Sequence, residues 1–155
     1  MNIDEALRLL LEYLSPFRDY FIIHQDFIHD IANCLKKELK GSESDFFDQM
    51  IAQLDYIKQF GKNVYQVNGN EILRGVGNDS NDCPWNLYSI HMSSKKYNMR
   101  FIIKFDEQST PFLLYAFFER SGKKKTDYTT PIQISKERYL ALKRFLESKI
   151  KEDTL

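Results

Sequence analysis

The sequence predicts an α+β domain in which a mainly antiparallel sheet of three to four strands packs against an N-terminal helical hairpin. The sheet is indicated by three aromatic-rich apolar runs, Leu87–Met92, Asn98–Phe105 and Thr110–Phe118. The connections between these runs are long enough for hairpins and too short for crossovers. Helices are indicated by apolar residues at helical spacing within the first 60 residues. With 155 residues, of which 43% are hydrophobic, one core is expected, so residues 1–155 are predicted to be a single domain.

Residues 1–60 predict three helices and one short strand. Asn2 or Asp4 can cap a first helix over Ile3–Leu14, which Pro16 ends. Its leucine-rich stripe is too large to stay exposed to water, so we expect this helix to be docked. A short strand follows within Asp19–His24. Two further helices are predicted, from about Asp26 to Leu39 and from Ser42 or Ser44 to about Phe60, with Gly41 and Gly61 as their stop signals. The short turn between these two helices predicts a helical hairpin.

Outside the three strands, the second half of the chain is less regular. Residues 61–85 are predicted to be mostly loop, with short extended pieces at Val64–Val67 and Ile72–Leu73. Trp85 is expected to anchor the start of the first strand in the core, or to stack on a base. A final helix begins after Thr130-Pro131 or at Ser135. The residues of its predicted buried stripe are Tyr139, Leu142, Phe145, Leu146 and Ile150.

Composition limits the function classes. No apolar run approaches the roughly 20 residues of a membrane span, and the N-terminus carries acids where a signal peptide carries Lys or Arg, so we expect a cytoplasmic protein without a membrane partner. Two cysteines and three scattered histidines are too few for a metal site, and no cofactor motif is complete. Residues 1–60 carry six Lys/Arg against eleven Asp/Glu, whereas residues 61–155 carry sixteen against eleven. The basic second half is compatible with an anionic partner.

The most function-like feature is a cationic cluster at the exit of the last predicted strand. Arg120 and Lys123–Lys125 follow Phe118 directly. In the preceding strand, alternation places Arg100 and Lys104 on one face and Phe101, Ile103 and Phe105 on the other. If the apolar face packs on the helices, the Arg100 face is left open to a ligand. In a hairpin Arg100 lies near Arg120, so one concave, cation-lined surface is expected. Each of these cations is equally compatible with an ordinary solvated surface.

Several sequence stretches resemble the RelE/HigB/ParE superfamily of toxin–antitoxin toxins. They are ILRG at 72–75, LYSIH at 87–91, YNMRFII at 97–103 and FERSGKKKT at 118–126. The last is similar to the phenylalanine-x-lysine-lysine-threonine passage of HigB-like members. The resemblance covers residues 18–148 and implies a RelE-like core there, with residues 1–16 as an extra N-terminal helix.

The resemblance implies a toxin that cleaves mRNA at the ribosome without metal and is held in check by a cognate antitoxin. RNA cleavage by a 2′-hydroxyl needs a base, an acid and cations around the phosphorane. Family members supply these groups from the sheet. The residues implied here as catalytic are Arg100, Arg120, Lys123, Lys124, His91 and Tyr128, and those implied as RNA-binding are Lys95, Lys96, Lys104 and Lys125.

A second function remains open on the same scaffold. Ser89 and His91 stand where many family members have Glu and Arg, and Glu119 interrupts the basic passage. These departures, together with the acidic first half, are compatible with a non-catalytic protein. Such a protein would be a ParE-like inhibitor of its target or an inactive binding protein.

Overall fold

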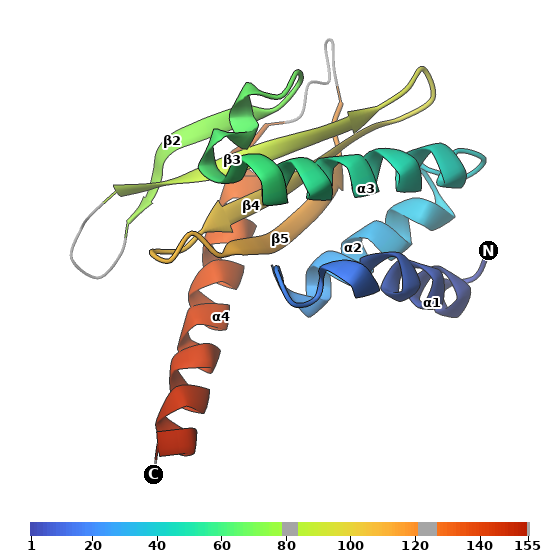
Figure 1. Ribbon diagram of the computed structural model, residues 1–155. Helices are drawn as coiled ribbons and strands as arrows, with labels where there is room; N and C mark the ends of the chain where they lie inside the picture. The colour runs from blue at the N-terminus through green and yellow to red at the C-terminus, as the bar shows by residue number, and fades with distance from the viewer. Residues whose placement is uncertain (79–83, 121–126, 155) are drawn as a thin grey trace.

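In the computed structural model, which describes residues 1–78, 84–120 and 127–154, helices lie on both faces of one sheet (Figure 1). The helices are α1 (Ile3–Leu14), α2 (Gln25–Lys36), α3 (Glu43–Phe60) and α4 (Thr129–Thr154), with short 3-10 helices η1 (Ser15–Phe17) and η2 (Gly61–Gln66). The strands are β1 (Ile22–Ile23), β2 (Glu71–Asn78), β3 (Pro84–Ser93), β4 (Asn98–Phe105) and β5 (Pro111–Phe118). The α+β class is therefore confirmed.

The sheet has the strand order β1-β5-β4-β3-β2. Neighbouring strands from β2 to β5 are antiparallel, which confirms the predicted meander. Two details of the prediction were wrong. The sheet has five strands, and β1 pairs with β5 in parallel through Ile22 and Ile23. The parallel pairing is possible because α2, α3 and three strands separate β1 from β5 in the chain, and this length is ample for a crossover connection.

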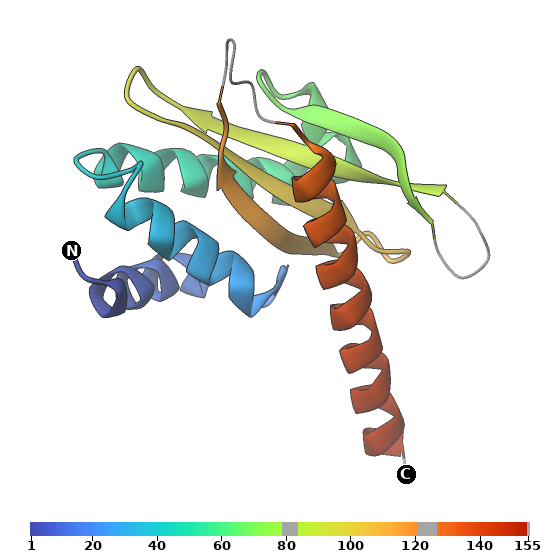
Figure 2. The same ribbon diagram turned by 180° about the vertical axis from the view of Figure 1, so that it is seen from behind.

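Each face of the sheet has its own core. On one face α1, α2 and α3 cover Ile90, Phe101 and Ile103, all of them fully buried. On the other face α4 covers Ile102 and Leu114 with Tyr139 (Figure 2). Because β4 has helices above and below it, seven of its eight residues are buried. A strand that is buried on both faces positions any polar side chain it carries in the interior.

The N-terminal helices pack differently from the predicted hairpin. α2 packs against α1 and β5, whereas α3 packs against β3. The first helix is docked as expected: Asn2 caps it, and Ala6, Leu10 and Leu14 are buried. The Tyr13 ring stacks on that of Phe47 with centroids 4.2 Å apart, which joins α1 to α3. The strong apolar stripe of α1 thus makes it, and not α3, the main partner of α2.

Two local expectations were wrong in the second half. Val64–Val67 is not extended, because most of it belongs to η2. The stripe of α4 is buried only in its first half: Phe145 is 59% exposed and Ile150 64% exposed. Figure 2 shows the reason, since α4 crosses the sheet and then projects beyond its edge. In the part of the chain that the structure describes, no helix is long and apolar enough to cross a membrane.

Candidate functional site

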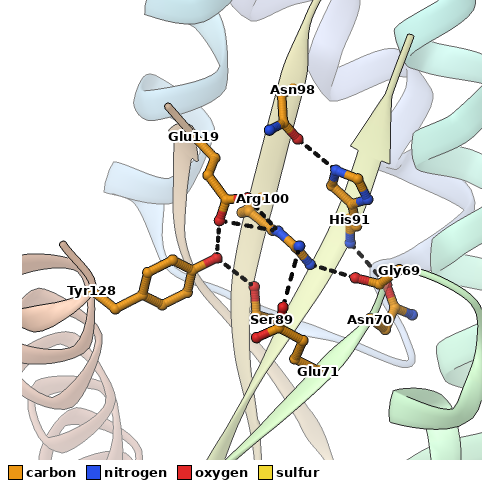
Figure 3. A network of polar contacts seen from close by, with 9 residues as sticks. All are labelled: Gly69, Asn70, Glu71, Ser89, His91, Asn98, Arg100, Glu119 and Tyr128. Atoms are coloured by element: carbon orange, nitrogen blue, oxygen red, sulfur yellow. Dashed lines mark hydrogen bonds and ion pairs between the residues drawn. The ribbon is translucent and has the colours of Figure 1, made fainter. Parts of the chain in front are cut away.

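The register of the meander gathers polar residues on the α4 face of the sheet. His91 on β3 lies directly opposite Arg100 on β4, and Met99 lies opposite Phe118 on β5. The Glu119 amide donates a hydrogen bond of 2.8 Å to the Asn98 carbonyl. The expected proximity of Asn98–Arg100 to Phe118–Arg120 is therefore confirmed. Figure 3 shows the resulting network, in which these side chains point toward one another.

Arg100 is the centre of this network and is not exposed. Its side chain is 7% exposed, and Nη1 donates to the Gly69 carbonyl oxygen over 2.6 Å. The Glu71 carboxylate lies 3.5 Å from Nη2, and both Glu119 carboxylate oxygens lie 3.4 Å from Nε. The expectation of an open Arg100 face was wrong, because Glu119 and the Gly69–Glu71 segment leading into β2 cover the guanidinium, while α4 covers Ile102 farther along the same face. Two carboxylates and a carbonyl satisfy a buried guanidinium that would otherwise be costly.

Tyr128, at the entry to α4, closes one side of the network. Its hydroxyl donates to Glu119 Oε2 and lies 3.4 Å from the hydroxyl of Ser89, which is fully buried. Burial and, secondly, the hydrogen bond to Glu119 raise the pKa of Tyr128 to about 12. The phenol therefore keeps its proton at neutral pH and acts as a donor that orients the Glu119 carboxylate.

His91 closes the opposite side. Its Nε2 lies 2.5 Å from the Asn98 side-chain oxygen, and its backbone amide donates to the Asn70 side-chain oxygen over 2.8 Å. Gly69 makes this packing possible: a Cβ at that position would lie 2.8 Å from His91 Nδ1, and its φ of +89° favours glycine. His91, Asn98 and Glu119 are each partly exposed, with Arg100 beneath them. The network thus offers solvent an imidazole and a carboxylate above a buried cation.

The other predicted cations are distributed over several places. Lys95, Lys96 and Arg120 border a shallow hollow of about 570 Å³ beside Asn98 and Glu119. Lys104 lies four residues along β4 from Arg100 and is 7% exposed under α4, away from this hollow. Lys123, Lys124 and Lys125 lie outside the described residues. The structure therefore brings Arg100, His91 and Tyr128 together, and it places Lys95, Lys96 and Arg120 next to them.

Sequence reasoning missed the acceptors of the network. Glu119 was interpreted as an interruption of a basic passage, yet it pairs with Arg100 and Tyr128. A signal was present: continued alternation from β5 places Glu119 on the same face as Phe117, which is opposite Arg100. Asn98, two residues before Arg100, shares its face by the same rule. The roles of Gly69 and Asn70 had no signal, because both depend on how η2 returns to the sheet.

The described residues contain no group of three or more His, Cys, Asp or Glu placed to hold a metal ion. Cys34 is buried, and burial is the main reason that its pKa is raised to about 12, so the thiol stays protonated. Cys83 lies outside the described residues. Comparison of the chain with protein-family models, with curated proteins and with solved structures finds no match.

Proposed function

We propose that this chain is a toxin-like endoribonuclease that cleaves mRNA at the ribosome and is held in check by an antitoxin protein. One observation carries the proposal: a partly exposed carboxylate and imidazole lie on the same sheet face as a buried arginine, with a protonated tyrosine beside them. These are the groups that cleavage by a 2′-hydroxyl needs without a metal. The order of elements from β1 through α2 and α3 to β5 also supports the resemblance to RelE-like toxins.

In this proposal Glu119 accepts the proton of the attacking 2′-hydroxyl. The oxygen forms a bond to phosphorus, the bond to the 5′-oxygen breaks, and His91 protonates that leaving oxygen. Arg100 stabilises the charge of the phosphorane, and Tyr128 positions Glu119 by its hydrogen bond. The products are a 2′,3′-cyclic phosphate and a free 5′-hydroxyl. Lys95, Lys96 and Arg120 contact neighbouring phosphates along the adjoining hollow.

A second candidate is supported by the pairing of Arg100. Glu119 and Glu71 both lie within 3.5 Å of its guanidinium and compete with a phosphate for it. A guanidinium that is neutralised in this way is a structural element and not a catalyst. The chain would then be a non-catalytic ParE-like inhibitor or an inactive binding protein on the same scaffold.

The experiment expresses the chain without a partner protein and follows growth together with mapping of mRNA 5′-ends. Glu119→Gln preserves shape and removes the base, so cleavage is expected to fall by roughly 10²–10⁴-fold. Glu12→Gln is the matched control, because Glu12 is an exposed, ion-paired carboxylate on α1, remote from the sheet face. Circular dichroism checks that both variants fold. Growth arrest without mRNA cleavage would reject the nuclease and favour the second candidate, and unchanged cleavage by Glu119→Gln would reject the proposed roles.

A further inference from the structure

Another hollow among the described residues lies at the other end of the Arg100 face. It is a cleft of about 820 Å³ between η2, α4, the start of β3 and the end of β4. We call it the Trp85 cleft. Its main lining residues are Lys62, Trp85, Lys104, Tyr139, Lys143 and Arg144. Its volume is within the range of small-molecule sites, which is about 300–1,000 Å³. Lys104, which lines the cleft, lies four positions along β4 from Arg100, a distance of about 13 Å in an extended strand.

Lys104 gives this cleft an unusual charge. Its side chain is almost completely buried, and its Nζ donates one hydrogen bond of 2.9 Å, to the Phe105 carbonyl oxygen. Within residues 1–78, 84–120 and 127–154, no carboxylate oxygen lies within 4.0 Å of this nitrogen. The rings of Trp85 and Tyr139 lie 4.7 and 4.5 Å from it and stabilise the ammonium in part. Glu107 and Asp106 attract this ammonium from beyond contact distance, so an anion that contacts it directly would relieve the remaining cost of its burial.

The rim of the cleft has no net charge, because its three basic residues, Lys62, Lys143 and Arg144, are matched by three acids. Of the three acids there, Glu107 is paired with Lys143 over 2.8 Å. Asp106 accepts hydrogen bonds from the amides of Gln108 and Thr110 and so holds its own turn. Glu147 is the remaining acid of the lining. The excess positive charge of the cleft is therefore that of the buried Lys104 ammonium, and an anionic group would bind there.

The walls favour a flat ligand. Trp85 lies against β2 at Gly77, where an added Cβ would come within 2.3 Å of the indole ring. The absence of a side chain at Gly77 thus lets the indole lie close to the strand and keep its place at the mouth of the cleft. The Tyr139 ring, tilted by 56° with its centroid 5.5 Å from that of Trp85, contacts the indole directly, so the two rings form one aromatic wall beside Lys104. Aromatic walls of this kind bind planar rings by stacking or edge contacts.

We propose that the Trp85 cleft binds a planar organic anion of the nucleoside monophosphate class, whose anionic group pairs with Lys104 and whose ring packs against Trp85. This site is separate from the proposed cleavage reaction and does not depend on it. Its affinity for an anion arises from the buried ammonium, and its selectivity for a flat ring comes from the aromatic wall that Trp85 and Tyr139 form.

Trp85 is the only tryptophan of the chain, so its fluorescence reports on the cleft directly. The probe is adenosine 5′-monophosphate, titrated against the intact protein while Trp85 emission is recorded. Adenosine has the ring but no phosphate, so it tests the contribution of the anion. Inorganic phosphate has no ring, so it tests the contribution of the ring. Lys104→Met removes the charge at nearly constant length. Arg144→Gln is the second variant, because this rim residue is exposed and its replacement does not disturb the core. Lys149→Met, on the exposed end of α4, is the matched control.

The expected result is saturable quenching by the monophosphate, with at least tenfold weaker binding of both adenosine and inorganic phosphate. Lys104→Met is expected to weaken binding at least tenfold and Arg144→Gln about threefold, with no change for Lys149→Met. Three outcomes would overturn the proposal: no emission change up to 10 mM monophosphate (roughly the weakest affinity of a useful site), equal binding of adenosine, or unchanged binding by both Lys104→Met and Arg144→Gln.

Discussion

Arg100 and Lys104 form a natural comparison, because they lie on the same face of the same strand and are both almost fully buried, yet their surroundings differ. Arg100 contacts two carboxylates and a backbone carbonyl. Lys104 contacts one backbone carbonyl and two aromatic rings. Within the described residues, carboxylates therefore contact Arg100 directly, whereas none lies within 4.0 Å of the Lys104 ammonium.

The difference separates two uses of a buried charge. Removing one partner of a compensated pair leaves the other charge buried alone, so Arg100 is tied to the stability of the fold. An uncompensated ammonium lowers stability, and removing it relieves the penalty of burial. Residues that lower the stability of a fold are typical of functional sites, where a ligand supplies the missing partner. The two ends of this face are thus distinguished by the sign of the stability change on substitution.

The largest expected effect is at the compensated end. Arg100→Ala leaves the carboxylate of Glu119 and the carbonyl of Gly69 without their cation, so we expect a loss of about 3–5 kcal/mol of unfolding free energy. Urea unfolding followed by circular dichroism measures it. Arg8→Ala is the control, since Arg8 forms only an exposed pair with Glu12 and its loss should have an effect below about 0.5 kcal/mol. A loss of less than about 1 kcal/mol for Arg100→Ala (about the value of an exposed pair) would show that its carboxylate contacts stabilise the fold no more than an exposed ion pair does.

The opposite sign is expected at Lys104. Burial lowers its pKa from 10.5 to about 8, with Glu107 and Asp106 opposing the shift and Lys62 and Lys143 adding to it. Lys104→Met should therefore raise the unfolding free energy at pH 7 by roughly 2 kcal/mol. This is less than the lowered pKa of Lys104 alone implies, because the rings of Trp85 and Tyr139 stabilise the ammonium. Between pH 8 and 10.5 the unfolded wild type binds more protons than the folded one, so its stability rises and the gap to the variant closes. Unfolding titrations of the wild type and of Lys104→Met from pH 7 to 10.5 measure the stability difference and its decline with pH. A destabilised Lys104→Met protein would show that Lys104 is structural.

The smallest effect is expected for Tyr128→Phe, which removes one donor to Glu119 and leaves the Arg100 pair in place. The expected loss is about 1 kcal/mol at neutral pH. Because the folded-state pKa of Tyr128 is raised to about 12, its contribution is fully present below pH 10 and is lost as pH rises through 12. The difference between wild type and variant, followed by alkaline unfolding, should therefore shrink over that interval. A difference that is constant with pH would contradict the assigned hydrogen bond.

Sequence alone predicted the meander, because short apolar runs and short turns leave few alternatives. It could not predict which face of β4 is covered. Arg100 and Lys104 alternate with apolar residues, and such a pattern usually indicates a solvated face. Here α4 covers that face, and its position depends on packing between residues far apart in the chain. The same cause explains Phe145 and Ile150: they fit the periodicity of a buried stripe, but the sheet ends before the helix does.

For the candidate site, the sequence predicted the donors better than the acceptors. Arg100, His91 and Tyr128 were proposed from residue type and resemblance, and they lie together. Glu119 was missed because a single acid among cations was interpreted as a departure from a motif. Gly69 contributes a carbonyl oxygen, and no residue-type pattern identifies a backbone acceptor. Lys104 was proposed as an RNA contact, whereas its burial under α4 makes it part of a different hollow.

The parallel pairing of β1 with β5 has a consequence for how the chain folds. Ile22 pairs with Phe112, so this contact closes a loop of about 90 residues at an entropic cost of about 4 kcal/mol. The hairpins β3–β4 and β4–β5 join neighbours in sequence and can form much earlier. During synthesis α1 and α2 therefore emerge long before β5, the strand on which α2 packs, and their apolar stripes remain without a sheet until the last third of the chain is made.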